Sequence, residues 1–244
     1  MIKIILTFTK IVVALIVTLV FASCGYNIDT IQGSGNIVSQ NRDVTADFTS
    51  IEVDRGIEVV VEQGDKSSIV VETDDNLQQH ITTEIRDGVL KISTDGRSVF
   101  ATEELKVTVK LPIISGLATS AGASLSSRNV LRSSDLVVKA SSGSEIKLST
   151  EADKIICETS SGSTIDVSGK ALIFETSSSS GSTIDAKDLL SNEVTAQSNS
   201  GSTIDVHPIV LLDAKASSGS SISYHSIPKQ IKMDESSGGS ISQQ

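Results

Sequence analysis

Three threonines and three aspartates recur at matched positions in this chain. Each copy of the hexapeptide SGSTID, at residues 161–166, 180–185 and 200–205, places a threonine two residues before an aspartate. The six residues are Thr164, Asp166, Thr183, Asp185, Thr203 and Asp205. If the copies stack, neighbouring carboxylates lie about 4.8 Å apart and repel one another, which calcium with its oxygen ligands would relieve. The alternative, solvated carboxylates offset by Lys147 and Lys187, is the one we expect, because the nonapeptide of calcium-binding β-rolls is missing.

The same acidic column could belong to an enzyme that cuts acidic polysaccharides. Such chemistry needs clustered acids, usually a metal ion, and a basic residue that handles a proton. Basic residues near the repeats are few, and so are aromatic residues for stacking on sugars; the basic ones are Lys147, Lys170, Lys187 and Lys215. A G-x-S-x-G nucleophile motif in a strand–turn–helix context is also missing. We therefore assign no catalytic residue and expect a protein that is not an enzyme.

Two histidines have a spacing that could bring them together. His207 and His225 each follow a repeat glycine, Gly201 or Gly219, by six residues, so they would stack on adjacent coils within reach of one metal ion. Two ligands do not make a metal site, and Pro208 perturbs the local register. We expect an incidental surface pair and no metal or other cofactor.

The N-terminal residues have the pattern of an export signal. Residues 1–23 contain Lys3 and Lys10, then an apolar run without acids, which is typical of a secretory signal peptide. The run is shorter than the roughly 20 residues that a membrane-spanning helix needs. It ends in FASC, which resembles a bacterial lipobox and predicts lipid attachment at Cys24. Several acyl chains would anchor the protein firmly, and the polar residues 24–38 would form a lipidated tether.

Charge and cysteine content restrict the partners. The formal net charge is −10, and about −12 once the signal peptide and its two lysines are removed. Such a surface repels phosphate backbones, which argues against nucleic-acid binding. With Cys24 lipidated, Cys157 is left without a disulfide partner, and we expect it to be a small buried apolar residue.

A period of about 19–20 residues runs through the C-terminal half. The repeat glycines are Gly122, Gly143, Gly162, Gly181, Gly201, Gly219 and Gly238, and an apolar residue follows each of them three positions later. A second apolar strand precedes each glycine, as in IICETS and LIFETS. One such unit cannot bury its apolar face alone, but stacked copies can. The sequence therefore predicts an all-β fold, a single-stranded β-solenoid (β-helix), over residues 116–244. Alternation along STIDV predicts that Ile165 points inward and that the threonines and aspartates point outward.

Residues 39–115 form a second region of short β-strands. IEVVVE, IVVET, VLKIS and LKVTVKL are rich in β-branched residues, roughly alternate, and are separated by Gly-Asp and Asp-Gly turns. This region forms either the first coils of the solenoid or a separate antiparallel cap.

The order of these motifs resembles the head GIN domain family (DUF2807). The resemblance rests on DFTSIEV, IEVVVEQG, VVET, ITTEIRDGVLKIS, LKVTVKLP and GLATSAGASL, and covers about residues 45–225. It implies an all-β, solenoid-like fold in an envelope lipoprotein of the auto-transporter adhesin type. It implies no catalytic residues.

The leading interpretation is a non-enzymatic envelope lipoprotein of the outer membrane that presents a solenoid surface to a glycan, matrix or protein partner. The six repeated threonines and aspartates would form its binding ladder. The alternative is a periplasm-facing structural or signalling lipoprotein, and a polysaccharide-active β-helix enzyme comes third. Residues 25–29 carry one acid, whereas some surface-exported lipoproteins carry an acid-rich run there, so the orientation stays open. The end coils could also pair with another chain through their edge strands.

Overall fold

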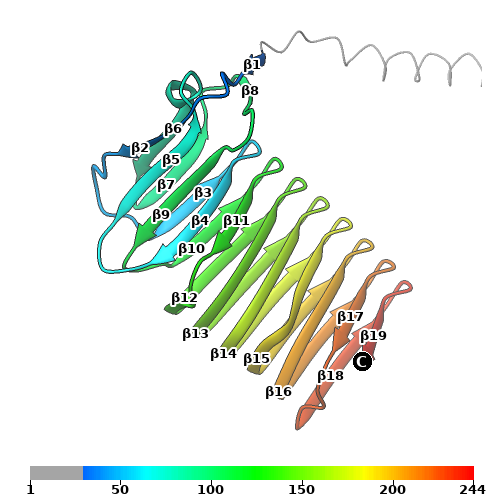
Figure 1. Ribbon diagram of the computed structural model, residues 1–244. Helices are drawn as coiled ribbons and strands as arrows, with labels where there is room; N and C mark the ends of the chain where they lie inside the picture. The colour runs from blue at the N-terminus through cyan, green and yellow to red at the C-terminus, as the bar shows by residue number, and fades with distance from the viewer. Residues whose placement is uncertain (1–29) are drawn as a thin grey trace, which may run out of the picture.

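The computed structural model describes residues 30–244, which form an all-β rod with a wider N-terminal end (Figure 1). The expected signal peptide and the lipid-attachment residue Cys24 lie outside the described residues. None of the helices within the described range is long and apolar enough to cross a membrane. The predicted fold class is confirmed, because the rod is a β-solenoid of about seven turns with about 19 residues per turn.

Ten strands build the regular part of the rod. In chain order they are β10 (Gly116–Thr119), β11 (Ser124–Ser127), β12 (Leu131–Ala140), β13 (Glu145–Thr159), β14 (Thr164–Ser178), β15 (Thr183–Ser198), β16 (Thr203–Ala216), β17 (Ser221–Tyr224), β18 (Gln230–Glu235) and β19 (Ser240–Gln243). Every pairing among them is parallel, and each strand pairs with the equivalent segment of an adjacent coil. Each coil contributes to two sheets that meet at corners. The long strands pass through a corner and contribute to both sheets, as β13 does by pairing with β11 along its first residues and with β12 along the rest.

The interior consists of columns to which each coil contributes one side chain. One column lies just after the glycine corner and contains Ile146, Ile165, Ile184, Ile204, Ile222 and Ile241 in register. A second lies before the corner, on the opposite sheet, and contains Ile155, Phe174, Val194 and Leu212 in register. All of these side chains are buried. Burying a side chain of this size contributes about 1.5–3 kcal/mol, which is why single coils that are weak alone stack into a stable rod.

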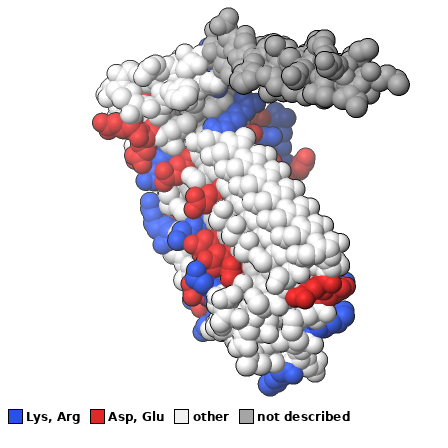
Figure 2. Space-filling model, turned by 90° about the vertical axis from the view of Figure 1, so that its right-hand side faces the viewer, with Lys and Arg blue, Asp and Glu red and all other residues white. Residues whose placement is uncertain are grey.

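The serine–glycine corners need two successive left-handed residues. In the corner at 160–163, Ser161 has φ 55° and Gly162 has φ 70°, and the other repeat corners share this geometry. Glycine adopts this region without strain, whereas the left-handed residue before it is unexpected, because serine resists this region. The buried Ser163 stabilises the corner, since its Oγ donates to the carbonyl of Ala140 at 2.7 Å and accepts from the Ser160 amide at 3.3 Å. The corners carry no charged residue, and Figure 2 shows a broad uncharged strip along the rod.

Nine strands and one short helix form the N-terminal end. They are β1 (Thr30–Gln32), β2 (Ile37–Arg42), β3 (Ser50–Val53), β4 (Glu58–Gln63), β5 (Ser68–Asp74), the 3-10 helix η1 (Gln78–His80), β6 (Ile81–Arg86), β7 (Val89–Thr94), β8 (Ser98–Phe100) and β9 (Lys106–Leu111). Strands β3 and β4 stack in parallel on β10 and β11 on one side and on β7 and β9 on the other. By contrast β5 runs antiparallel to β9 and β2, and β6 antiparallel to β7. The region therefore contains both coils of the solenoid and an antiparallel cap.

The coils at this end are stacked out of chain order. The chain makes the coil β3–β4 first, passes through the cap, and then adds β7–β9 on the outer side of that coil. It returns to the inner side with β10, which pairs with β3 and β12. Alternation of side chains predicts which face of a strand is buried but does not select its neighbour, so this order is a finding of the structure.

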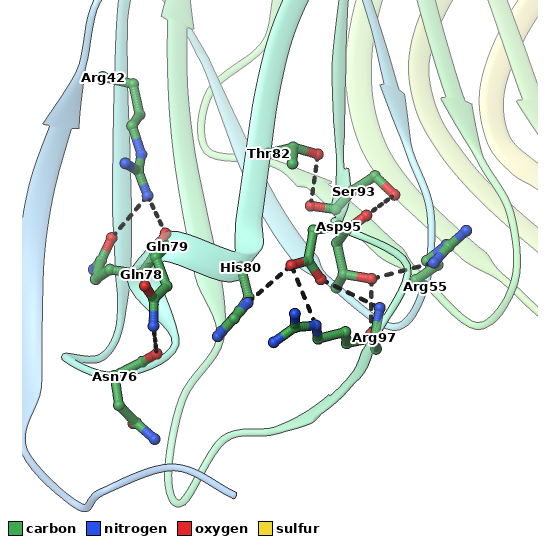
Figure 3. A network of polar contacts seen from close by, with 11 residues as sticks. Arg42, Arg55, Asn76, Gln78, Gln79, His80, Thr82, Ser93, Asp95 and Arg97 are labelled. Atoms are coloured by element: carbon green, nitrogen blue, oxygen red, sulfur yellow. Dashed lines mark hydrogen bonds and ion pairs between the residues drawn. The ribbon is translucent and has the colours of Figure 1, made fainter. Parts of the chain in front are cut away.

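A polar network surrounds η1 in the cap (Figure 3). The Gln78 amide Nε2 donates to the carbonyls of Val38 and Val71, at 2.9 and 3.0 Å. The Arg42 guanidinium donates to the Gln78 carbonyl at 2.7 Å. His80 Nδ1 lies 2.9 Å from Asp95 Oδ2, and this contact holds the pKa of the Asp95 carboxyl below its usual value. The network gives the buried side chains of η1 hydrogen-bond partners, while Arg42 Nε is buried without one.

Residues 30–38, part of the expected tether, are instead fixed to the cap. Strand β1 pairs in parallel with β8, and β2 begins at Ile37. Between them the Gly35 amide donates to Asp74 Oδ1 at 2.6 Å, and the Ser34 amide donates to Asn76 Oδ1 at 3.0 Å. The tether prediction rested on polar, glycine-rich composition, which does not reveal that Asp74 and Asn76, about 40 residues away, accept hydrogen bonds from these amides.

We call the attachment of residues 30–38 to the cap the N-terminal clamp. Acid is expected to weaken this clamp through Asp74. Hydrogen bonds from the Thr102 and Gly35 amides outweigh burial and hold the pKa of the Asp74 carboxyl below its ordinary value of 3.8. A lowered native pKa stabilises the fold above the unfolded pKa, and this stabilisation is lost as the pH falls through the native value. Hydrogen exchange of the amides of residues 33–36 should therefore accelerate below about pH 3.8 beyond its intrinsic pH dependence.

Asp74→Asn should show the accelerated exchange already at neutral pH, because the neutral amide accepts more weakly and adds donors that find no acceptor there. Asp65→Asn, at an exposed turn outside the clamp, is the matched control and should not change exchange. Equal protection of residues 33–36 in wild type and Asp74→Asn would contradict a role for this carboxylate.

Candidate functional site

The six repeated threonines and aspartates line up on one outer face of β14, β15 and β16. Thr164 pairs with Thr183 and Thr183 with Thr203, in strict register between adjacent coils. The three aspartates pair in the same way, one column further along. All six side chains are partly exposed, and the intervening isoleucines are buried. We call this surface, made of Thr164, Asp166, Thr183, Asp185, Thr203 and Asp205, the ladder face.

Each carboxylate of the ladder face has its own cationic or hydrogen-bonding partner. Lys147 Nζ lies 2.8 Å from Asp166 on the next coil. Lys187 Nζ lies 2.5 Å from Asp185, two residues away on the same strand. These contacts raise the pKa of both lysines, so both ammonium groups stay charged at neutral pH. Asp166 and Asp185 are therefore each offset by a lysine, and Asp205 lies 3.0 Å from His225 Nε2.

The threonine column offers hydroxyl groups that are free to bind. Thr203 Oγ1 accepts a hydrogen bond from Ser221 Oγ at 3.3 Å. The hydroxyls of Thr164 and Thr183 have no hydrogen-bond partner within residues 30–244. The ladder face thus combines paired charges with a row of available donors and acceptors, repeated at about 4.8 Å from coil to coil.

The two histidines bind different partners. His207 Nδ1 lies 2.9 Å from the carbonyl oxygen of Lys187, and His225 Nε2 lies 3.0 Å from Asp205 Oδ1. Pairing of Val206 with Tyr224 puts the two histidines at the next position of adjacent coils. The register of β15 against β16 shifts just before His207, which pairs with Leu190. Among the residues that the structure describes, no three His, Cys, Asp or Glu side chains are grouped to hold a metal ion.

Cys157 is a core residue. It lies in an inward column between Val138 and Thr176 and has no exposed surface. Burial raises the pKa of its thiol far above the usual value. The thiol is therefore unreactive in the folded protein, since the thiolate is the nucleophile.

A groove at the second corner of the coils was not predicted. It has a volume of about 820 Å³ and runs across β12 to β16, with Leu172, Leu190 and Ile209 among its lining residues. These three side chains are 52 %, 39 % and 42 % exposed. The sequence does carry a signal for it: an aliphatic residue breaks the alternation at about the same place in successive repeats, as Leu189-Leu190 does. We call this site the corner groove.

A family model described as "Putative auto-transporter adhesin, head GIN domain" (DUF2807) matches residues 47–228. No curated protein matches the sequence.

Several solved structures share the fold. A "putative adhesin" from Bacteroides fragilis NCTC 9343 aligns with a TM-score of 0.82 at 20% identity, over 88% of this chain and 100% of its own. A "putative lipid binding protein" from Parabacteroides distasonis ATCC 8503 aligns with a TM-score of 0.74 at 20% identity, over the same shares of both chains. A "putative adhesin" from Parabacteroides merdae ATCC 43184 gives 0.71 at 20% identity, over 88% of this chain and 99% of its own. None of these descriptions names an enzyme. Residues 30–244 share one continuous buried core, which runs from Phe48 to Ile241, so a fragment of these residues is suited to experiments in solution.

Proposed function

Because the chain belongs to the head GIN domain family, whose model matches residues 47–228, we propose that it is a non-enzymatic, lipid-anchored binding protein of the bacterial cell envelope. Cys24 carries the lipid anchor and holds the protein at the outer membrane. The solenoid is a rigid body that presents the ladder face to a glycan, matrix or protein partner.

The in-register ladder face is the observation that carries this proposal. Contacts that are weak singly add up when several are made at once, provided that the ligand repeats with a matching geometry. The ladder face holds the same side chain in the same orientation on three successive coils. A buried aliphatic core beneath it keeps the spacing constant.

The chemistry of the ladder face favours a polar partner without strong charge. Two of its aspartates are balanced by Lys147 and Lys187, the third contacts His225, and its free groups are hydroxyls. The formal charge of −10 keeps nucleic acids away. A repeating glycan, rich in hydroxyl donors and acceptors, fits these groups best.

The side of the membrane on which the protein lies decides between adhesion and an internal structural or signalling role. Protease added to intact cells should cleave the protein as readily as in lysed cells if the solenoid faces outward. Protection until lysis would contradict adhesion and would favour the periplasm-facing alternative.

Thr183→Lys is expected to abolish or strongly weaken binding of the fragment 30–244 to its ligand on an array of glycans and matrix proteins. Thr183 lies at the centre of the ladder face, between Thr164 and Thr203, and a lysine there would block the neighbouring hydroxyls without touching the core. Thr195→Lys, an exposed threonine of the same strand on the opposite sheet, is the matched control. Equal binding by both variants would contradict the ladder face as the binding surface.

A further inference from the structure

The corner groove has a charged end, its polar end, and an end rich in aliphatic side chains, its apolar end, and Asp153 and Asn192 are also among its lining residues. Its polar end is an outward column in which Arg132 pairs with Glu151 and Glu151 with Lys170, each one coil further along the rod. The next position of the same column is Leu190. Leu172 and Ile209 extend the apolar end, and they are large aliphatic side chains that the fold leaves about half exposed. In this column the side chain changes from a charged to an aliphatic one at the step from Lys170 to Leu190, and His207 follows Leu190 on the next coil.

Lys170 is an available cation at this step. Arg132 Nε is engaged by Glu151 Oε2 at 3.2 Å. Lys170 is exposed and makes no hydrogen bond or ion pair with any of residues 30–244. Hydroxyls of Ser133 and Ser134 lie at the same polar end.

The apolar end is built for a flexible chain. No aromatic residue lines the groove, so a sugar ring or another planar ligand would find no face on which to stack. The volume of about 820 Å³ lies within the range of sites for small ligands. Exposed aliphatic side chains that are grouped beside a groove usually have an apolar partner.

We propose that the corner groove binds a single-chain anionic amphiphile, a fatty acid or a chemical relative. Its acidic head lies at Lys170, and its hydrocarbon chain lies along Leu172, Leu190 and Ile209. The site is separate from the ladder face and does not depend on the function proposed for it. Binding of the amphiphile can therefore be lost without loss of binding at the ladder face, and the reverse.

The affinity should depend on chain length. Isothermal titration calorimetry of the fragment 30–244 with decanoate, dodecanoate and tetradecanoate, each kept monomeric, would measure it. Transfer of one methylene from water contributes about 0.8 kcal/mol when burial is complete. In an open groove we expect about two- to fourfold tighter binding for each added methylene. An affinity that does not rise with chain length would overturn the proposal.

Two variants test separately the contacts with the hydrocarbon tail and with the acidic head of the ligand. Leu190→Asp should weaken dodecanoate binding at least tenfold, whereas Ile227→Asp should not change it, because Ile227 is 73 % exposed and does not line the groove. Lys170→Gln should weaken dodecanoate binding about two- to fivefold, the range of an exposed ion pair, and should leave dodecanol binding unchanged. Lys215→Gln, an exposed lysine away from the groove, is the control for total charge.

Other occupants would give different results. Binding to phosphatidylcholine vesicles without binding of monomeric fatty acids would assign the groove to a membrane surface. Self-association of the fragment in the ultracentrifuge that Leu190→Asp abolishes would assign it to a second copy of the chain. Either result, or equal loss with Leu190→Asp and Ile227→Asp, would overturn the proposal.

Discussion

Phe174→Ala is expected to lower the free energy of unfolding by about 3–5 kcal/mol, the usual cost of emptying a buried aromatic site. Phe174 is the largest fully buried side chain of the solenoid, and it lies in an inward column between Ile155 and Val194. Both neighbours belong to paired β-strands, so the backbone cannot collapse into the cavity without breaking the register. Urea unfolding of the fragment 30–244, followed by circular dichroism, would measure the change.

The loss of stability in Phe174→Ala should come from the cavity, because removing an exposed apolar side chain leaves none. Leu172→Ala on the same strand removes an aliphatic group that is 52 % exposed, and should change stability by less than about 0.5 kcal/mol. Phe174→Leu keeps most of the volume and should cost about 1 kcal/mol. A loss below about 1 kcal/mol for Phe174→Ala would contradict a tightly packed column.

Gly169→Ala is expected to lower the free energy of unfolding by about 2–4 kcal/mol, because two unfavourable effects combine. Gly169 has φ 119°, a conformation that residues with a Cβ rarely adopt. An added Cβ would also lie 2.0 Å from the carbonyl oxygen of Thr150 on the preceding coil. That oxygen belongs to the backbone of a paired strand and cannot move aside alone. The same urea titration would measure the loss.

Gly162→Ala separates the effect of backbone strain from that of a steric clash of the added Cβ. Gly162 has φ 70°, but no atom lies within 4 Å of its would-be Cβ. This substitution should cost only the left-handed conformation, about 1–2 kcal/mol. If both alanine variants lost the same stability, the close approach of Gly169 to Thr150 would not be the cause.

The repeat predicted the solenoid well because its apolar side chains are local and periodic. Ile165, three residues after Gly162, is inward as alternation requires, and its equivalents form one buried column. The N-terminal end was harder to predict. Its strands have the same β-branched composition whether they stack as a coil, like β7, or run antiparallel in the cap, like β6.

The two candidate sites also differ in how well the sequence alone predicted them. The ladder face was predictable because its six residues are copies of one motif at one spacing. The corner groove combines residues that are not copies of one another, such as Arg132, Lys170 and Leu190, and only the register of the coils puts them in one column. The clamp on residues 30–38 depends on Asp74, a partner about 40 residues away whose role no local pattern reveals.

The sequence by itself determined the coil. Its length, its buried column and its outward threonines and aspartates follow from side-chain alternation and from the backbone freedom of glycine, which act within one repeat. Only the tertiary structure decided the coil order at the N-terminal end, the clamp at Asp74 and the corner groove. These features depend on which strands become neighbours, and that choice is set by packing over the whole molecule, because many strands offer the same apolar face.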